Sequence, residues 1–223
     1  MRITTCTSVP MYYSSKNIQL VTNNQSKVNF RGLNINEISA RKRLEEFTRR
    51  GYNLIRNDVD IISPNGIAIK GCAFVKDNLN HEEAWRNSIQ LIITDKDYKA
   101  LGEINSYHLK ISKSNDILSC SIRNFTNKYN LMKDFMEPEF EAHDNSEGKY
   151  KKVGTGLYDN LVKYIKENHP QYKTLYASIR SQESWNFHSK YGFTMDFAGK
   201  KHPDFDDYDT YSPSANYLFY NIK

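Results

Sequence analysis

The chain has 223 residues, of which 39% are hydrophobic, 13% aromatic and 26% charged, and its formal net charge is +5 at pH 7. This size suits one large domain, or one domain of common size with an extension, and the aromatic content allows a sizeable core. No apolar run approaches the roughly 20 residues that cross a bilayer, so no membrane partner is expected.

Location, metal binding and nucleic-acid binding are also constrained by composition. Residues 1–20 lack the apolar block of a signal peptide, which favours a cytoplasmic protein. The three cysteines, Cys6, Cys72 and Cys120, are far apart and odd in number, so we expect neither a metal site nor a disulfide framework. The positive charge forms no extended basic stripe, which argues against dedicated nucleic-acid binding. The oligomeric state cannot be read from these features.

The N-terminal part combines a polar segment with an amphipathic one. Residues 1–35 are rich in Ser, Thr, Asn and Gln and show no periodicity, which predicts a mobile or loosely attached extension. The stretch 36–51 places apolar residues among charges at helical spacing. It predicts a helix that has Asn36 as its N-cap and ends at Gly51.

Strand patterns fill the middle of the chain. Apolar residues alternate on both sides of Asn65-Gly66 and predict a hairpin over 58–71, because Gly accepts the positive φ of a tight turn. Three further alternating stretches predict neighbouring antiparallel strands at residues 88–95, 100–112 and 116–126. A short helix is indicated at 81–85, and residues 127–137 stay open between helix and loop.

From Pro138 onward the patterns alternate between strands and helices. They predict a strand at 138–144, a turn at 145–150, a helix ending before Pro170, a strand at 174–180, a short helix at 181–193, a strand at 193–198, a polar loop at 199–214 and a strand at 215–222. This order predicts an α+β fold in which one crossover helix joins neighbouring strands.

The turn Gly154-Thr155-Gly156 opens the crossover helix. Several backbone N–H groups at a helix N-terminus have no intrahelical partner, and together with the helix dipole they form an anion site. Glycine lets a phosphate approach the main chain, and Lys151 and Lys152 add positive charge beside it. The turn therefore suits a diphosphate. The alternative is that these glycines only turn the chain. The patterns of a P-loop and of a Rossmann fingerprint are absent.

Two motifs resemble those of the GCN5-related N-acetyltransferase (GNAT) superfamily. The first is Lys151-Lys152-Val153-Gly154-Thr155-Gly156, which resembles the family's [QRK]-x-x-G-x-[GA] pattern before an amphipathic helix. The second is a strand followed by a short helix that ends in Tyr191-Gly192-Phe193, at family-like distance. The resemblance covers roughly residues 88–223, and it is best from Pro138 onward.

The resemblance implies a GNAT-like acyltransferase domain over residues 36–223. Its fold would be a mixed α/β arrangement with a twisted, mostly antiparallel sheet, splayed between two strands and flanked by helices. The implied activity is N-acyl transfer, usually of acetyl from acetyl-CoA, to a small-molecule or peptide amine, without a metal. One alternative is a catalytically idle GNAT-like module that binds CoA or regulates a partner. The other is a non-GNAT domain that binds nucleic acid or protein, which the basic charge favours but no motif supports.

The resemblance also implies a cofactor site. The diphosphate would lie against the turn, and the pantetheine arm would pair with the backbone of the predicted strand 138–144. A residue at the end of the following strand and one at the start of the second helix would complete the site. The implied residues are Phe140, Ala142, His143, Lys151, Lys152, Val153, Gly154, Thr155, Gly156, Leu157, Arg180 and Gln182.

Three residues are the candidates for catalysis. His188 stands where the family often has a tyrosine that protonates the departing thiolate, and a histidine could donate in its place. Alternatively, His188 packs as an ordinary half-buried side chain. Tyr191 is a second donor candidate, or an anchor of its helix. Glu141 is a base candidate, together with Glu103 and Glu139, although each is equally compatible with a solvated strand residue.

Overall fold

The computed structural model describes residues 35–79, 87–108, 117–125, 140–145, 147–179, 181–194 and 216–222. They form three helices and seven strands: α1 (Ile35–Arg49), β1 (Asn53–Ile62), β2 (Ala68–Asp77), β3 (Ser88–Thr94), β4 (Ala100–His108), β5 (Ile117–Asn124), α2 (Val153–Asn168), β6 (Thr174–Ile179), α3 (Gln182–Tyr191) and β7 (Asn216–Asn221). Several predictions lie outside the described residues: the extension up to residue 34, the helix at 81–85, the stretch 127–137, Arg180 and the loop 199–214.

The strands form one sheet in the order β1-β2-β3-β4-β5-β6-β7. Every neighbouring pair is antiparallel except β5 and β6, which are parallel and are joined in sequence through α2. Only three residue pairs link β5 to β6, from Ile117↔Thr174 to Ser119↔Tyr176. Beyond them, the described residues 120–124 and 177–179 form no pair with each other, so the sheet is splayed there. The predicted fold class is confirmed.

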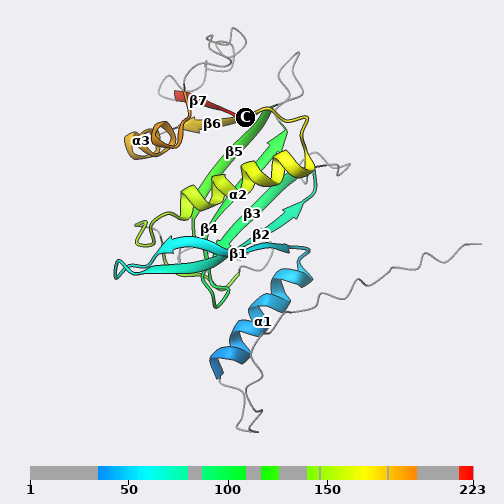
Figure 1. Cartoon of the computed structure of the whole chain (residues 1–223), viewed down its shortest axis with the longest axis vertical. Helices are drawn as coiled ribbons and strands as arrows, with labels where there is room; N and C mark the ends of the chain where they lie inside the picture. Colours follow the sequence, from blue (N-terminus) through cyan, green and yellow to red (C-terminus); the bar gives the residue numbers. More distant parts are fainter. Residues whose placement is uncertain are drawn as a thin grey trace, which may run out of the picture. The chain divides into compact units, whose positions relative to one another are not determined.

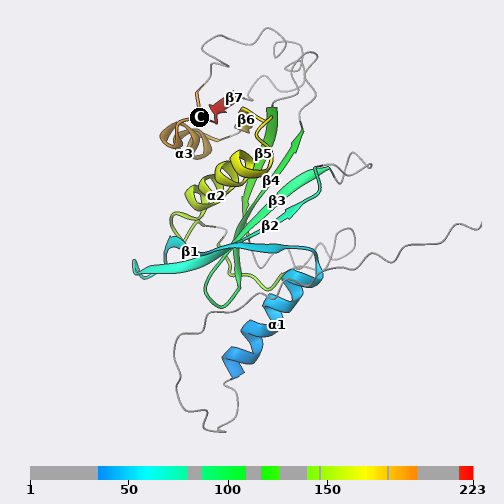
Figure 2. The ribbon, with the colours of Figure 1, turned by 45° about the vertical axis from the view of Figure 1, so that its right-hand side comes forward.

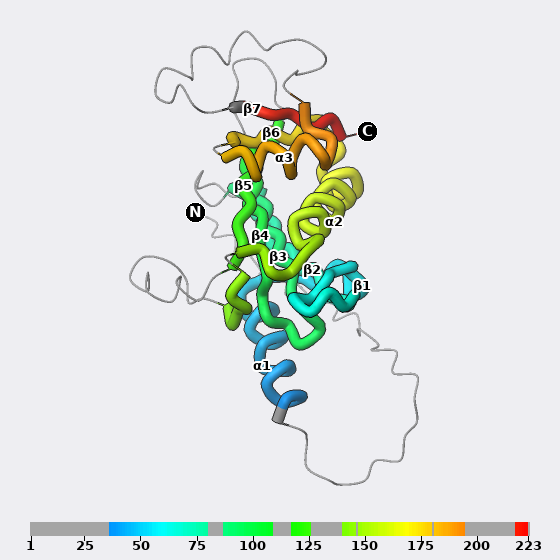
Figure 3. The backbone as a smooth tube through the Cα atoms, turned by 90° about the vertical axis from the view of Figure 1, so that its left-hand side faces the viewer, coloured from blue at the N-terminus to red at the C-terminus, as the bar shows by residue number. Residues whose placement is uncertain are grey.

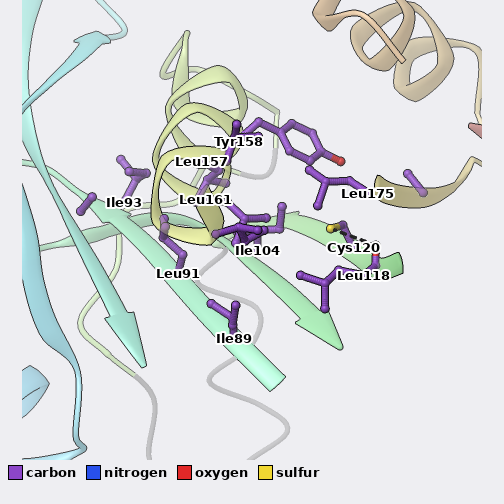
Figure 4. Packing of buried hydrophobic residues seen from close by; sticks show 14 of the residues in the cluster. Ile89, Leu91, Ile93, Ile104, Leu118, Cys120, Leu157, Tyr158, Leu161 and Leu175 are labelled. Atoms are coloured by element: carbon purple, nitrogen blue, oxygen red, sulfur yellow. Dashed lines mark hydrogen bonds between the residues drawn. The ribbon is translucent and has the colours of Figure 1, made fainter. Parts of the chain in front are cut away.

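Helix α2 covers one face of the sheet because one side of it is apolar (Figure 1). Leu157, Leu161 and Ile165 are fully buried against side chains from the central strands, among them Leu91 and Ile104 (Figure 4). Gly156 allows the close approach, since a Cβ atom there would lie 3.0 Å from Val59 Cγ1 of β1. This packing fixes the position of the N-terminus of α2 over the sheet.

Helix α1 packs through aromatic side chains against the other face. Phe47 stacks between Phe74 of β2 and Phe140, with ring centroids 4.2 and 4.1 Å away. The predicted helix is confirmed, but Asn36 is not its N-cap, because the helix already begins at Ile35. Gly51 follows the helix with a φ of 81°, as a glycine stop requires.

The predicted hairpin is confirmed and is longer than predicted. The turn pairs Ile62 with Ala68, and Gly66 has a φ of 77°. The pairing of β1 with β2 has two register shifts, between Leu54 and Val59, and irregularities of this kind increase the local twist of a strand. The turn of the hairpin projects to the left in Figure 2, away from the other strands.

The predicted strand at 138–144 is wrong over its described residues, 140–144. Among these only Ala142 forms a bridge, to Ala100 at the start of β4. This segment lies beside the start of β4, beyond the end of β5. Phe140 and Ala142 pack there against the aromatic cluster that includes Phe47 of α1. Their burial explains the alternation of apolar and polar residues without a ladder of strand hydrogen bonds. Of the strand predicted at 193–198, Thr194 pairs with Phe219, and the residues after it lie outside the described ranges.

The two described cysteines, Cys72 and Cys120, are buried and free. Burial raises the pKa of Cys72 to about 11 and that of Cys120 to about 12, so neither thiol is reactive at neutral pH. Within the described ranges no group of three or more His, Cys, Asp or Glu side chains could hold a metal ion. No helix in that part of the chain is long and apolar enough to cross a membrane.

Gly71 allows a close approach of β2 to its neighbours. A Cβ atom there would lie 2.2 Å from the carbonyl oxygen of Thr94 and 2.3 Å from Ile61 Cδ1. We therefore expect Gly71→Ala to lower the free energy of unfolding by about 1–3 kcal/mol, measured by urea denaturation. Gly148→Asn is the matched control, since Gly148 has a φ of 61° that Asn tolerates and no atom within 4 Å of its Cβ position. Equal stability of the two variants would contradict the expectation.

Candidate functional site

The N-terminus of α2 has free backbone donors. Its N-cap, Lys152, adopts a left-handed conformation with a φ of 65°, and no side chain caps the helix. The Gly156 N–H donates to Lys152 O at 2.8 Å, whereas the N–H groups of Val153, Gly154 and Thr155 have no partner among the described residues. A left-handed residue followed by helical ones directs successive N–H groups into one concavity, which suits an anion.

Positive charge surrounds these donors. Lys151, Lys152 and Thr155 are exposed, so the two ammonium groups can reach a ligand bound at the helix end. The side chains of Val153 and Leu157 are buried in the core and cannot touch such a ligand. Of the predicted site residues in this turn, Val153 can therefore contribute only through its backbone.

A fixed loop leads into the helix. Lys151 forms two backbone hydrogen bonds with Ile62 of β1, at 2.9 and 3.1 Å. Just before it, the Tyr150 N–H donates to Asn145 Oδ1 at 2.9 Å. Asn145 is 0% exposed, and its Nδ2 donates to Leu101 O at 3.3 Å and to Asn124 Oδ1 at 3.2 Å. The loop is thereby attached to β1, β4 and β5 before a ligand arrives. Sequence patterns did not indicate Asn145, because its partners lie up to 44 residues away.

The glycines of the turn also have packing roles. A Cβ atom at Gly154 would lie 2.7 Å from Phe187 Cζ of α3, and one at Gly156 would touch Val59. Close packing against α3 and β1 therefore also requires a residue without a Cβ atom at these two positions. It does not compete with anion binding, because the free donors belong to the backbone.

The splay of the sheet opens beside this helix end. A Cβ atom at Gly102 would lie 2.9 Å from Val153 Cγ1 and 3.2 Å from Arg123 O, so the first residue of α2 lies next to the end of β5. Helix α3 starts after the end of β6 and contacts Gly154 through Phe187. Figure 3 shows α3 beside β6 and β7, close to α2. The free donors, the unpaired strand ends and α3 therefore converge.

His188 lies inside the α2–α3 interface and is 6% exposed. Its Nδ1–H donates to Ser184 O at 2.7 Å, which leaves Nε2 to accept from Tyr158 Oη at 2.9 Å. Burial lowers the pKa of His188, against the opposing effect of the Ser184 hydrogen bond. The geometry favours the packing alternative, with a neutral ring held on both sides. Tyr158, which the sequence analysis did not single out, is the partner.

Tyr191 and Gln182 also make contacts within the helices. Tyr191 Oη donates to Asp159 Oδ1 of α2 at 2.9 Å. Burial and, after it, the Asp159 carboxylate raise the pKa of Tyr191, so its proton is held tightly. Gln182 is exposed at the first turn of α3 and donates to Asn186 Oδ1 at 2.9 Å. The anchoring alternative for Tyr191 is an attachment of its helix to the sheet, and the relevant contact is the packing of its ring against Tyr220 of β7, with centroids 5.3 Å apart.

The structure does not bring the side chains of Phe140 and Glu141 to the helix end. Phe140 stacks on α1, and Glu141 forms ion pairs with Arg43 at 2.8 Å and Lys99 at 3.4 Å. The hydrogen bond from Arg43 lowers the pKa of Glu141, which makes it a weaker base.

The backbone of this segment is also engaged. Ala100 N–H donates to Glu141 O, and His143 N–H donates to Ala100 O, both at 2.9 Å. The His143 ring pairs with Asp95 Oδ2 at 2.6 Å. The strand that diverges from β6 is β5, and the segment 140–143 does not pair with β6.

Several solved structures are similar to this chain. One is yncA of Salmonella typhimurium, whose structure contains its cofactor acetyl-CoA: it is 13% identical, with a TM-score of 0.38, and the match covers 61% of this chain and 65% of that one. Another is an acetyltransferase of the GNAT family from Streptococcus pneumoniae, 13% identical, with coverage of 61% and 68% and a TM-score of 0.38. A third is the N-acetyltransferase PseH of Campylobacter jejuni, 14% identical, with coverage of 65% and 73% and a TM-score of 0.36.

The topology of this chain decides the fold. One parallel, splayed strand pair joined through a crossover helix, within an otherwise antiparallel sheet, is the arrangement that the two motifs implied. The fold is GNAT-like. The chain spans just under two thirds of the length of the Salmonella protein. No protein-family model matches the chain, and no curated protein matches it. The chemistry of the site rests on the residues described above.

Proposed function

We propose that this chain is an acyl-CoA-dependent N-acyltransferase that transfers an acyl group, usually acetyl, from acetyl-CoA to a small-molecule or peptide amine. The observation that carries the proposal is the N-terminus of α2, where free backbone donors and two exposed lysines lie beside the splay between β5 and β6. A diphosphate attached to a long, narrow arm fits this combination, because the helix end binds the anion and the splay accepts the arm.

Each part of acetyl-CoA has a place in this arrangement. The diphosphate would accept from the N–H groups of Val153, Gly154 and Thr155 and pair with the lysines. The pantetheine amides would form hydrogen bonds with the backbone of β5 at 120–124 and of β6 at 177–179. Over these residues the two strands do not pair with each other. Gln182 is the first residue of α3, the helix that follows β6, and would flank the arm.

The transfer step needs a neutral amine and a proton for the thiolate. The amine nitrogen attacks the thioester carbonyl carbon, the C–N bond forms and the C–S bond breaks. The proton that the amine loses balances the one that the thiolate gains. Glu141 is disfavoured as the base because its ion pairs lower its pKa. Glu103 of β4 is also ion-paired, with Arg123, but it neighbours β5, the strand that diverges from β6, so its position makes it the better candidate.

Binding of acetyl-CoA to the whole chain tests the proposal. We expect acetyl-CoA at 100-fold its Kd to stabilise the fold by about 2.7 kcal/mol in a thermal-shift series. S-acetyl-pantetheine lacks the diphosphate, and we expect it to bind at least about 10-fold more weakly, because charge-assisted hydrogen bonds at the helix end are lost. Equal binding of the two compounds would remove the helix end from the site. Absence of CoA release in the presence of primary amines would remove the transferase activity.

A further inference from the structure

Strand β4 presents polar side chains on the face of the sheet opposite α2. A Cβ atom at Gly102 would point at α2, and Ile104 is buried in the same core as the helix. Side chains alternate along a strand, so Glu103, Asn105 and Tyr107 lie on the other face. This face belongs to the middle of the sheet, next to the strand that leaves β6.

Glu103 is a buried carboxylate. It is 8% exposed and forms an ion pair with Arg123, its direct cross-strand neighbour on β5. It also accepts a hydrogen bond from Asn105 Nδ2 at 3.2 Å. A carboxylate at this depth is costly unless it is paired, and its two partners stand on the same face.

The Asn105 side chain has an oxygen with no partner. Asn105 Oδ1 is buried and makes no hydrogen bond with any residue that the structure describes. The amide cannot turn over to relieve this, because Nδ2 is the atom that can donate to the Glu103 carboxylate. A buried acceptor without a donor is destabilising, and a ligand that donates a hydrogen bond there would remove that cost.

We propose that Asn105 Oδ1 and the Glu103 carboxylate together bind the primary ammonium group of the acceptor. An ammonium group supplies three donors and a positive charge, which match one unpaired oxygen and one carboxylate. A quaternary ammonium has the charge but no N–H donor, so it is excluded from this site. That the bound ammonium group belongs to the acceptor rests on the proposed function. Ammonium binding at Asn105 itself does not depend on cofactor binding.

The position of the pair relative to the splay supports this assignment. Glu103 is paired in register with Arg123, and Asn105 with Ser121, and both of these β5 residues lie in the part that no longer pairs with β6. The Arg123 side chain is 45% exposed and Tyr107 is 47% exposed, so the oxygen lies just below the surface. An amine held there would stand beside the strand along which the pantetheine arm is proposed to run.

The first test observes the Asn105 side-chain amide by ¹H–¹⁵N NMR in the protein without acetyl-CoA. Its resonance is assigned by its loss in Asn105→Leu, or in Asn105→Asp if the leucine variant does not fold. The protein is titrated with ethylammonium chloride and, separately, with tetramethylammonium chloride. We expect a saturable shift several-fold larger with ethylammonium. The Asn87 side chain is the matched control, since Asn87 Oδ1 is also buried and unpartnered but precedes β3. Equal responses to the two salts, or an equal response of Asn87, would overturn the proposal.

A second test separates this proposal from the cofactor site. In a CoA-release assay with cadaverine, glucosamine and lysine methyl ester, we expect Asn105→Leu to raise the KM for the amine about 10-fold or more, the loss typical of one hydrogen bond to a charged group. The Kd for acetyl-CoA should change less than twofold. An unchanged amine KM would contradict the assignment of Asn105. Failure of the parent protein to bind acetyl-CoA would contradict the proposed function and leave the NMR result to decide the ammonium site.

Discussion

Thr155→Glu is expected to weaken acetyl-CoA binding by about 10- to 100-fold or more while the protein stays folded. Thr155 is exposed in the first turn of α2, next to free N–H donors. A carboxylate there would bind those donors itself and repel the diphosphate. The same carboxylate favours the helix, because negative charge at a helix N-terminus is typically worth about 0.3–1 kcal/mol. Isothermal titration with acetyl-CoA measures the loss of binding, and urea denaturation measures the stability.

Thr155→Gln is the matched control, since it has the same length and no charge. We expect it to retain most of the affinity, which would assign the loss in the glutamate variant to charge. Gly154→Glu would be a less clean variant, because a Cβ at Gly154 meets Phe187 Cζ at 2.7 Å and could move α3. If Thr155→Glu binds acetyl-CoA as tightly as the parent protein, the diphosphate does not lie at this helix end.

The elements that local pattern determines were predicted well. Helix α2 follows from apolar residues at helical spacing, and β3, β4 and β5 from alternation, because each of these signals is contained within one element. The turn at Gly66 is equally local, since a positive φ selects glycine or asparagine. The free donors at the start of α2 could be predicted for the same reason, because helix ends leave backbone N–H groups without intrahelical partners irrespective of the side chains further away.

What the sequence could not show depends on partners distant in the chain. The alternation at 140–143 resembles a strand, yet it arises because Phe140 packs against Phe47 of α1, some 90 residues earlier. Asn145 is indistinguishable from any polar turn residue until Leu101 and Asn124 surround it. The orphan oxygen of Asn105 is likewise invisible in a sequence, since it is defined by the absence of a donor in three dimensions.

His188 shows most clearly how a distant partner decides a role. By motif position it is a candidate proton donor, but the hydrogen bonds with Tyr158 at Nε2 and with Ser184 O at Nδ1 fit a neutral ring, and burial lowers its pKa. We expect His188→Ala to lower the free energy of unfolding by about 2–4 kcal/mol, because it leaves a cavity and strands the buried Tyr158 hydroxyl. Ser189→Ala, at the exposed neighbouring position, should change stability by less than about 0.5 kcal/mol.

The same variants test the catalytic hypothesis. If His188 packs only, the single-turnover rate per folded molecule stays at the parent value in His188→Ala. If it donates the proton to the thiolate, that rate falls by about 10²–10⁴-fold, and His188→Tyr restores part of it.

The pH dependence of stability is a second readout for His188. The pKa of His188 is lowered in the folded state, so its contribution to stability is full above its unfolded pKa of about 6.5 and is lost as the pH falls through the lower folded pKa. His188→Ala should therefore lose less stability than the parent protein between pH 7.5 and 5. A parallel decline in both proteins would show that the buried ring does not titrate differently on folding, and would reopen its assignment as a packed, neutral side chain.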